Sequence, residues 1–492
     1  MKSLVKWQLI SFVSRSIATV LGIIQGAIVF RILTQTEFGL KELALSIGGA
    51  LGIYQHLGLA SATTREIAAA EDDSEIFKIF VTSVFARYCV TIPLAIGLYM
   101  SSGYVSRKYP GLELPLKLYA FSLLFQGMQS ILNAVISGTK RFKHLFIYQV
   151  VIAFVSVILY VPLVYFFRVA GFFHAFLAFN IVSTVSLAFL AFRPLKGKMK
   201  FPSWKDFKRL LKEIFSISIA IYVVKVLYTN WEKLGNNLLG LFVSAEAVAL
   251  FGFAMIFAKK LMLISDSVTD VNLPVLSEKY KKDISDFKRT FISNFNKVFS
   301  VVIIAASLGT YWAPQVVIIY GGLDKYYEYQ ESLKLVPPLI MSFVIYSFIN
   351  IVMSSILVPA KLVRSMIVGF TGMLLGTGGA FLLGRVYFNI LHSMAWAMVI
   401  GAAGALLYLK RVVKRKLDFN FLTDSHILLF IQTFAICILG SVEYVWIKVG
   451  AFLPLSFLLC WGILTAGFIS KEEYKLLINK ARGFIKCRNI RA

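Results

Sequence analysis

Acidic residues are scarce in this chain of 492 residues, since 25 Asp and Glu stand against 51 Lys and Arg and leave a net charge of +26. Cysteine is also sparse, and its four residues form neither a disulfide framework nor a metal-binding set. The five histidines lack metal-ligand spacing, and no G-x-x-x-x-G-K-[ST] phosphate loop occurs. These absences argue against a metal site, a cofactor, a built-in ATPase or another enzyme activity.

Long apolar runs dominate what is present. Hydrophobic residues make up 58% of the sequence, and the mean hydropathy is +0.76. A helix needs about 20 mostly apolar residues to cross a bilayer. The sequence therefore predicts an all-α, polytopic membrane protein with 14 transmembrane helices, over residues 9–31, 43–62, 76–100, 116–137, 145–167, 170–192, 215–241, 245–268, 291–313, 333–357, 365–388, 390–409, 426–447 and 449–469.

The basic residues alternate between the two sides of these predicted spans. Starting from the N-terminus, every second loop carries about 35 of the Lys and Arg residues, whereas the other loops carry about 10. Basic loops stay in the cytoplasm, so we expect a multi-pass protein of the cell (inner) membrane with both termini cytoplasmic. A basic surface in this position faces anionic membrane lipids, and we expect no nucleic acid partner.

Two cytoplasmic segments have the period of an amphipathic helix. Between residues 203 and 214, apolar residues recur at helical spacing among lysines and arginines, and Ser203 with Asp206 fits a capping box. Residues 474–485 of the basic tail repeat the pattern. Both segments are predicted to lie flat on the inner leaflet of the membrane.

A weak internal repeat suggests how the spans are grouped. The turn at residues 33–44 resembles the turn at residues 243–254, and each falls between the first two helices of a six-helix block. Parallel repeats of this kind are common in transporters. The predicted domains are an N-terminal six-helix bundle over 1–200, a C-terminal six-helix bundle over 201–416 that begins with the interfacial helix, and helices 13–14 with the basic tail over 417–492.

Three basic residues lie well inside their predicted spans, where a charge is expensive. Arg15, Arg87 and Lys225 each cost about 2.5–3.5 kcal/mol at a helix centre, and such residues usually face a water-filled cavity or a partner. Lys225 also shares one helix face with Glu232. Because the deep charges are mostly basic, the predicted cavity suits an anionic ligand, and arginine in particular matches phosphate oxygens.

Neutral polar side chains form stripes on two further spans. Interhelical hydrogen bonding is one interpretation of these stripes, and contact with a polar ligand is the other. The stripe of the fourth span consists of Gln126, Gln129 and Asn133, and that of the tenth consists of Tyr346, Asn350 and Ser354.

Three stretches of sequence resemble the Wzx-type polysaccharide and oligosaccharide flippases of the MOP superfamily, which also holds the MATE exporters. The first is the turn at residues 33–39 with the segment Gln55-His-Leu-Gly-Leu-Ala-Ser-Ala-Thr-Thr-Arg-Glu-Ile-Ala68. The others are Ile136-Ser-Gly-Thr-Lys-Arg-Phe142 and Asn272-Leu-Pro-Val-Leu-Ser277. The family often has Asp where this chain has His56.

The resemblance implies that the protein moves a lipid-linked oligosaccharide from the cytoplasmic to the outer leaflet by alternating access, with polysaccharide-assembly enzymes as further partners. It further implies that Arg15, Arg87 and Lys225 meet phosphates or acidic sugars, and that Arg65 acts at the cytoplasmic mouth or pairs structurally with Glu66. The sugar hydroxyls would bind Gln126, Gln129, Asn133 and Asn350. Glu232 would couple an ion or neutralise Lys225 or Lys233.

Other functions stay open from sequence alone. A cation-coupled MATE-type exporter shares the twelve-span core, but its cavity is expected to carry carboxylates. A membrane-embedded enzyme of polysaccharide assembly is expected to have a large outer loop, and the longest outer loop here, about 314–333, is far shorter than the roughly 50 residues of a folded domain. A scaffold for such enzymes is the remaining alternative.

Overall fold

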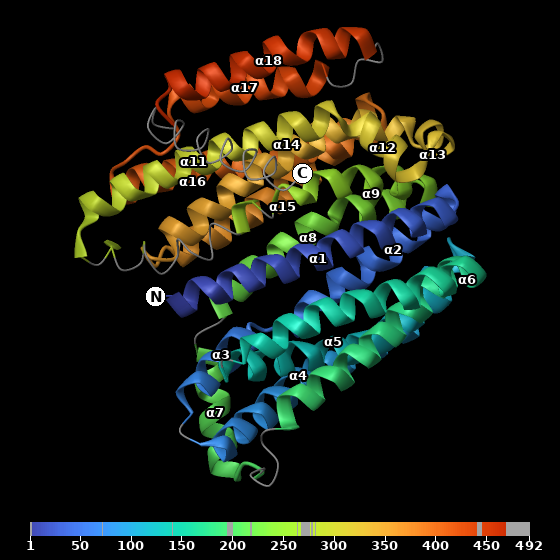
Figure 1. Cartoon of the computed structure of the whole chain (residues 1–492), viewed down its shortest axis with the longest axis vertical. Coiled ribbons are helices and arrows are strands. Elements are labelled where there is room, and N and C mark those ends of the chain that lie inside the picture. Colours follow the sequence, from blue (N-terminus) through green and yellow to red (C-terminus); the bar gives the residue numbers. More distant parts are fainter. Residues whose placement is uncertain are drawn as a thin grey trace, which may run out of the picture. The chain divides into compact units, whose positions relative to one another are not determined.

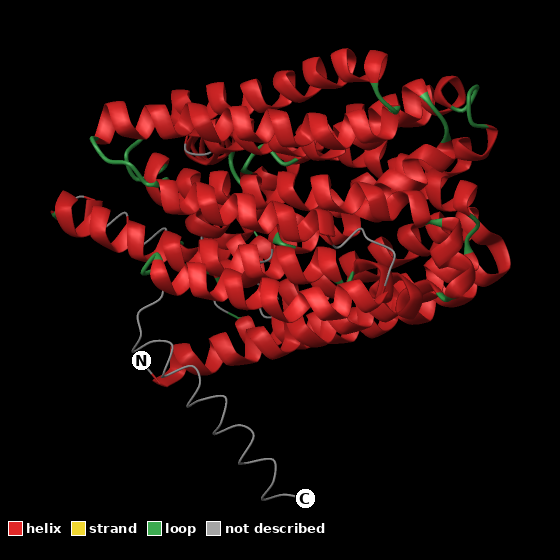
Figure 2. Cartoon of the chain, turned by 90° about the horizontal axis from the view of Figure 1, so that it is seen from above, coloured by secondary structure: helices red, strands yellow, loops and turns green. Residues whose placement is uncertain are grey.

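The computed structural model describes residues 2–468, apart from 71, 140, 194–199, 217–218, 263, 267–275, 277–278, 281 and 440–444. Figure 2 shows that the described part of the chain consists of helices and short connections, without a strand. The predicted all-α fold class is therefore confirmed for these residues. The second amphipathic segment, 474–485, lies outside them.

Packing contacts divide the chain into two units. The first unit contains Met1–Gly252 and Tyr320–Glu328, and the second contains Phe253–Ile319 and Tyr329–Ala492. The predicted division into two six-helix bundles and an appended helix pair stays a prediction.

In the described part of the chain, the first unit holds ten helical elements of the N-terminal half and one short helix from later in the chain. They are α1 (Lys2–Ile32), α2 (Gln35–Gly52), η1 (Ile53–Gln55), α3 (Leu59–Ala69), α4 (Asp73–Val105), η2 (Pro110–Leu112), α5 (Glu113–Gly138), α6 (Phe142–Phe192), α7 (Trp204–Ser216), α8 (Ile219–Phe242) and α13 (Leu323–Glu328). Figure 1 labels the α-helices among them.

The second unit is built around helices of the C-terminal half. They are α11 (Ile284–Tyr311), α14 (Gln330–Val352), η4 (Met353–Leu357), α15 (Val363–Tyr387), α16 (Ile390–Leu417), α17 (Asp424–Leu439) and α18 (Val445–Thr465). Two helices cross from one unit's residue range into the other's, α9 (Ala245–Lys260) and α12 (Ala313–Gly321).

Eight helices in the described part of the chain are long and apolar enough to cross a membrane, and three shorter ones are also apolar. This pattern is that of a multi-pass membrane protein. The longest, α6, combines two predicted spans, because its backbone turns sharply at Arg168 (φ 52°, ψ −131°) and leads back to the starting end, where the Arg141 guanidinium donates to the Leu190 and Ala191 carbonyls. The count of 14 transmembrane helices stays a prediction.

The core of the first unit includes the amphipathic helix α7. Leu210 and Ile214 are buried among apolar residues of α3, α4, α5 and α6, whereas Trp204 on the same helix is 70% exposed. The ammonium of Lys78 on α4 donates to the Asp206 carboxylate at 3.1 Å. α7 thus packs half of its apolar face on the bundle, and its place at the inner leaflet stays a prediction.

In the second unit, α14 is the buried centre. Residues 335–352 of this helix are all buried, and α14 packs on α11, α16 and α17. Polar side chains of the predicted stripe therefore bond inside the protein: Asn350 Nδ2 donates to Asp266 Oδ1 at 2.8 Å, and Ser354 Oγ donates to the Asn350 carbonyl at 2.9 Å.

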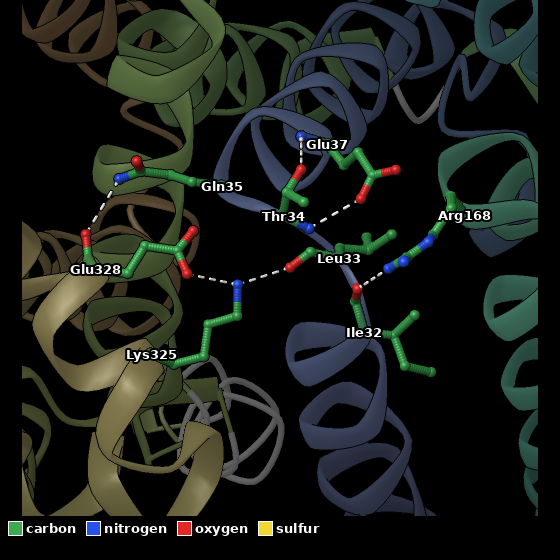
Figure 3. Close-up of polar contacts among 8 residues, drawn as sticks. All are labelled: Ile32, Leu33, Thr34, Gln35, Glu37, Arg168, Lys325 and Glu328. Carbon is green, nitrogen blue, oxygen red and sulfur yellow. Dashed lines mark hydrogen bonds and ion pairs between the residues drawn. The ribbon is translucent and has the colours of Figure 1, made fainter.

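The turn between α1 and α2 is held by side chains from distant parts of the sequence (Figure 3). The last carbonyls of a helix have no partner within it. Here Arg168 donates to the Ile32 carbonyl, and Lys325 Nζ donates to the Leu33 carbonyl at 2.7 Å while it pairs with Glu328 at 2.7 Å. Cations at a helix C-terminus are also favoured by its dipole.

The two turns of the internal repeat share a local geometry. Thr34 caps α2, because its hydroxyl accepts from the Glu37 amide while the Glu37 carboxylate accepts from the Thr34 amide. Ser244 occupies the aligned position before α9, and its hydroxyl accepts from the Ala247 amide at 3.2 Å. Both turns therefore start a helix with a hydroxyl N-cap.

The buried face of α7 generates a stability prediction. Leu210→Ala and Ile214→Ala each leave a cavity in a packed core, so we expect each to lower the unfolding free energy by about 2–5 kcal/mol. Chemical unfolding of the purified protein in detergent measures this loss. Trp204→Ala is the control on the exposed face; an equal loss in the control would contradict the described docking of α7.

The Lys78–Asp206 contact predicts a pH dependence. Hydrogen bonds from Lys78 and Ser203 hold the pKa of the Asp206 carboxyl below its ordinary value of 3.8. A lowered pKa adds stability above the ordinary value, and this contribution is lost as the pH falls through the folded-state pKa. We expect Asp206→Asn to lower the melting temperature at neutral pH and to match the wild type at a pH below the folded-state pKa of Asp206. Asp424→Asn, at an exposed acid, should follow the wild type at both pH values.

Candidate substrate-binding site

The predicted second span is a broken helix. α2 ends at Gly52, η1 follows, and Leu57 (φ 43°) and Gly58 (φ 69°) adopt left-handed conformations before α3 begins. Glycine accepts this conformation without steric cost, which explains Gly58, whereas Leu57 is an unusual occupant. Irregular backbone at membrane depth is tolerated only where it is buried in protein or lines a cavity. The break brings the side chains of Gln55 and His56 to α4.

Arg87 of α4 is completely buried beside this break. Its Nη1 donates to Ser130 Oγ at 3.2 Å, and its Nη2 donates to His56 Nδ1 at 3.1 Å. Because a guanidinium can only donate, Nδ1 of His56 must be unprotonated. Arg87 Nε is buried without a hydrogen-bond partner. No carboxylate in the described part of the chain pairs with Arg87.

Neighbouring side chains leave this guanidinium little room to move. Thr91, one turn after Arg87, lies with its hydroxyl 3.1 Å from Gln55 Oε1. Gly127 on α5 faces the same point, and a Cβ added there would lie 3.5 Å from Arg87 Nε. The absence of a side chain at Gly127 therefore lets α5 approach the charge closely.

Lys225 places a second cation near the first. Its side chain on α8 is exposed, and electrostatic repulsion acts between it and Arg87. Two hydrogen bonds hold α8 at the helix break: Tyr222 Oη donates to the Tyr54 carbonyl at 2.9 Å, and Asn230 Nδ2 donates to Tyr54 Oη at 3.3 Å. Two cations without a carboxylate partner favour an anion, since an anion relieves both the repulsion and the buried charge. The joint binding of one anionic ligand by Arg87 and Lys225 stays a prediction.

Most of the neutral residues predicted to bind substrate bond within the protein. Gln129 Nε2 donates to the Asn180 carbonyl at 2.9 Å and to Thr184 Oγ1 at 3.2 Å, which ties α5 to α6. Gln126 shares a side-chain hydrogen bond with Tyr119 of its own helix. Asn133 is half-buried on α5. Asn350 belongs to the second unit, where it bonds Asp266.

The remaining predicted charges have different surroundings. Arg65 pairs with its neighbour Glu66 at 2.5 Å, and its side chain is 56% exposed. The Glu232 carboxylate lies 3.6 Å from Lys233 Nζ. Arg15 lies in α1, but its side chain falls outside the described residues. The roles predicted for all nine residues stay predictions.

Sequence reasoning missed Ser130, which bonds the Arg87 guanidinium, and also Gln55 and Thr91, which bond each other beside it. Thr91 follows Arg87 by four residues and Ser130 follows Gln126 by four, so helical periodicity contained a signal for both. Gln55 and His56 carried no such signal, because the helix break that directs them is a local departure from the predicted span.

The described helices are those of a multi-pass membrane protein. Residues 28–331 match the family described as Polysaccharide biosynthesis protein. This match covers more than half of the chain, and the chain belongs to this family, which is that of the Wzx-type flippases. The predicted family is confirmed. No curated protein matches the chain.

Solved structures show the same fold in the MOP superfamily. A multidrug resistance MATE family transporter in its inward-facing conformation has a TM-score of 0.68 and 14% identity, covering 83% of this chain and 98% of its own. The lipid II flippase MurJ, in an inward closed conformation, has a TM-score of 0.69 and 14% identity, covering 94% and 99%. MATE in complex with MaL6 has a TM-score of 0.59 at 14% identity, covering 85% and 96%. At this identity the likeness concerns the fold alone.

The bond between His56 and Arg87 yields a prediction for anion binding. His56→Asp puts a carboxylate beside the guanidinium, and the resulting ion pair competes with any anionic ligand. We expect the affinity of the purified protein for inorganic diphosphate, measured by calorimetry, to fall by about tenfold or more. His56→Asn adds no charge and should stay near the wild type. Equal affinities of the two variants would contradict an anion site at Arg87.

Proposed function

We propose that this protein is a flippase that moves a lipid-linked oligosaccharide from the cytoplasmic to the outer leaflet of the cell (inner) membrane by alternating access. The phosphate groups that join sugar to lipid bind Arg87 and Lys225, while the lipid tail stays in the bilayer. The protein delivers the lipid-linked oligosaccharide to glycan-assembly enzymes on the outer side and performs no covalent chemistry itself. Both termini are cytoplasmic.

The observation that supports this proposal is the buried Arg87 guanidinium with neutral partners only. A buried charge without a counter-ion costs several kcal/mol. A cation exporter would gain nothing from such a residue, because it repels the substrate. A phosphorylated substrate, in contrast, supplies the missing negative charge while it is bound.

The family and the fold agree with a flippase. The family description concerns polysaccharide biosynthesis, and one protein of similar fold is named a lipid II flippase. A lipid-linked, phosphorylated glycan is a substrate class that fits both names and the cationic site.

Three further assignments complete the proposal. Arg65 contacts the substrate at the cytoplasmic mouth, and Arg15 adds a further cation from α1. Sugar hydroxyls bind four amide side chains once transport frees these side chains from their present contacts within the protein. They are Gln126, Gln129, Asn133 and Asn350. Glu232 couples transport to an ion, which requires that its carboxylate first separates from the Lys233 ammonium.

Reconstitution tests the proposed function directly. Purified protein in liposomes should move a fluorescent polyprenyl-diphosphate oligosaccharide between leaflets, as measured by its accessibility to a membrane-impermeant quencher. We expect Arg87→Ala to slow this movement about tenfold or more and Arg87→Lys to retain an intermediate rate, because lysine keeps the charge without the planar fork.

Arg193→Ala is the matched control. Arg193 is an exposed arginine that lies over the Phe189 ring, at the end of the bundle opposite to the α1–α2 turn. Its rate should equal that of the wild type. Undiminished movement by Arg87→Ala, or transport of an organic cation by the wild type in the same liposomes, would contradict the proposal.

A further inference from the structure

The end of the first unit where α8 stops contains a cavity that the Arg87 site does not include. We call it the α8-end cavity; its volume is about 410 Å³, and its lining includes Leu43, Ile47, Tyr104, Arg107, Asn237 and Leu241. These residues come from α2, the end of α4 with the connection to η2, and the last turns of α8. In the predicted topology, this is the outer end of the bundle.

The lining combines an apolar floor with a basic rim. Leu43 and Ile47 of α2 and Leu241 of α8 supply apolar surface. Arg107 lies on the rim, where its guanidinium is exposed and stacks over the Tyr104 ring at 5.2 Å. A cavity of this kind fits an amphiphile with an apolar chain and an anionic head group.

The neighbouring Lys108 has a structural role. Its ammonium donates to the Gly240 and Leu241 carbonyls at 3.1 and 2.7 Å, and Tyr109 Oη donates to the Gly240 carbonyl at 2.8 Å. These bonds cap the C-terminus of α8 and fix the cavity wall. Arg107 is therefore the rim cation that is available to a ligand.

A polar atom inside the cavity lacks a partner among the described residues. Asn237 lines the cavity, and its Oδ1 is buried without a hydrogen bond to any of them. Buried polar atoms normally have partners, so this carbonyl oxygen is suited to accept from a hydroxyl of a ligand.

The helix α8 connects the cavity with the Arg87 site. Lys225 and Asn237 lie on this one helix, twelve residues or about 18 Å apart at 1.5 Å per residue. Asn230, Glu232 and Asn236 add polar side chains between them. A head group released from Arg87 and Lys225 would follow this helix toward its outer end.

We propose that the α8-end cavity is a second binding site for the substrate, which holds the phosphorylated head and first isoprene units of a lipid-linked glycan on the outer side. Arg107 binds the phosphate, Leu43, Ile47 and Leu241 contact the chain, and Asn237 accepts a hydroxyl from the first sugar. This inference rests on the proposed function for its choice of a prenyl phosphate.

Binding to the purified protein tests this site without requiring transport. The probe is geranylgeranyl diphosphate, titrated by calorimetry into protein that carries Arg87→Ala, so that the first site is weakened. We expect one remaining binding event, weakened about tenfold or more by the further change Arg107→Ala and equally by Ile47→Trp, which fills the floor. Adding Arg193→Ala instead should leave the affinity unchanged.

Two shorter probes separate the head from the chain. Geranylgeraniol lacks the phosphates and inorganic diphosphate lacks the chain, so each should bind at least about tenfold more weakly than the complete probe. Arg107→Ala changes an exposed side chain, so its melting temperature should match that of the parent. It therefore tests the site even if Ile47→Trp misfolds.

The possible results distinguish the two proposals. Loss of all binding in Arg87→Ala alone, or binding that is insensitive to both Arg107→Ala and Ile47→Trp, would overturn the second site. Equal competition by a phosphatidic acid would also overturn it, in favour of a site for bulk anionic lipid. Failure of the wild type to move lipid-linked glycan, together with binding at the α8-end cavity, would instead overturn the proposed function alone.

Discussion

The proposed substrate site depends on one buried charge. Arg87 is fully enclosed, it donates to Ser130 and His56, and no described carboxylate neutralises it. Hydrogen bonds to neutral acceptors offset part of the cost of removing a guanidinium from water, but they leave its net charge in place. A buried guanidinium of this kind favours a negatively charged ligand, and the proposed function rests on this preference.

The broken helix between α2 and α3 makes this arrangement possible. A continuous helix would bond its own backbone throughout and point successive side chains around its axis. The left-handed residues Leu57 and Gly58 interrupt this order, so that Gln55 and His56 both reach α4. Discontinuous helices of this kind form the substrate sites of many transporters, because they offer polar groups where regular helices have none.

The sequence predicted the parts of this structure that follow from periodicity and charge. Apolar runs and loop charges indicated a helical membrane protein, whereas the functional roles of Arg87 and Lys225 stay predictions. Tertiary partners were harder to predict. Gln129 was predicted to bind a ligand, but its amide donates to Asn180 and Thr184 of α6. Only the geometry between the two helices determines this partner. Likewise, the amphipathic pattern of α7 did not reveal that Leu210 and Ile214 pack into the bundle, because membrane and protein interiors select the same apolar face.

The central claim is that the Arg87 guanidinium receives its missing negative charge from the substrate. An experimental structure of the protein with a bound polyprenyl-diphosphate glycan tests this claim most directly. We expect such a structure to show a phosphate oxygen within hydrogen-bonding distance of Arg87, with Lys225 turned toward the same phosphate. A structure in which Arg87 keeps only His56 and Ser130 while the diphosphate binds elsewhere along the transport path would contradict it.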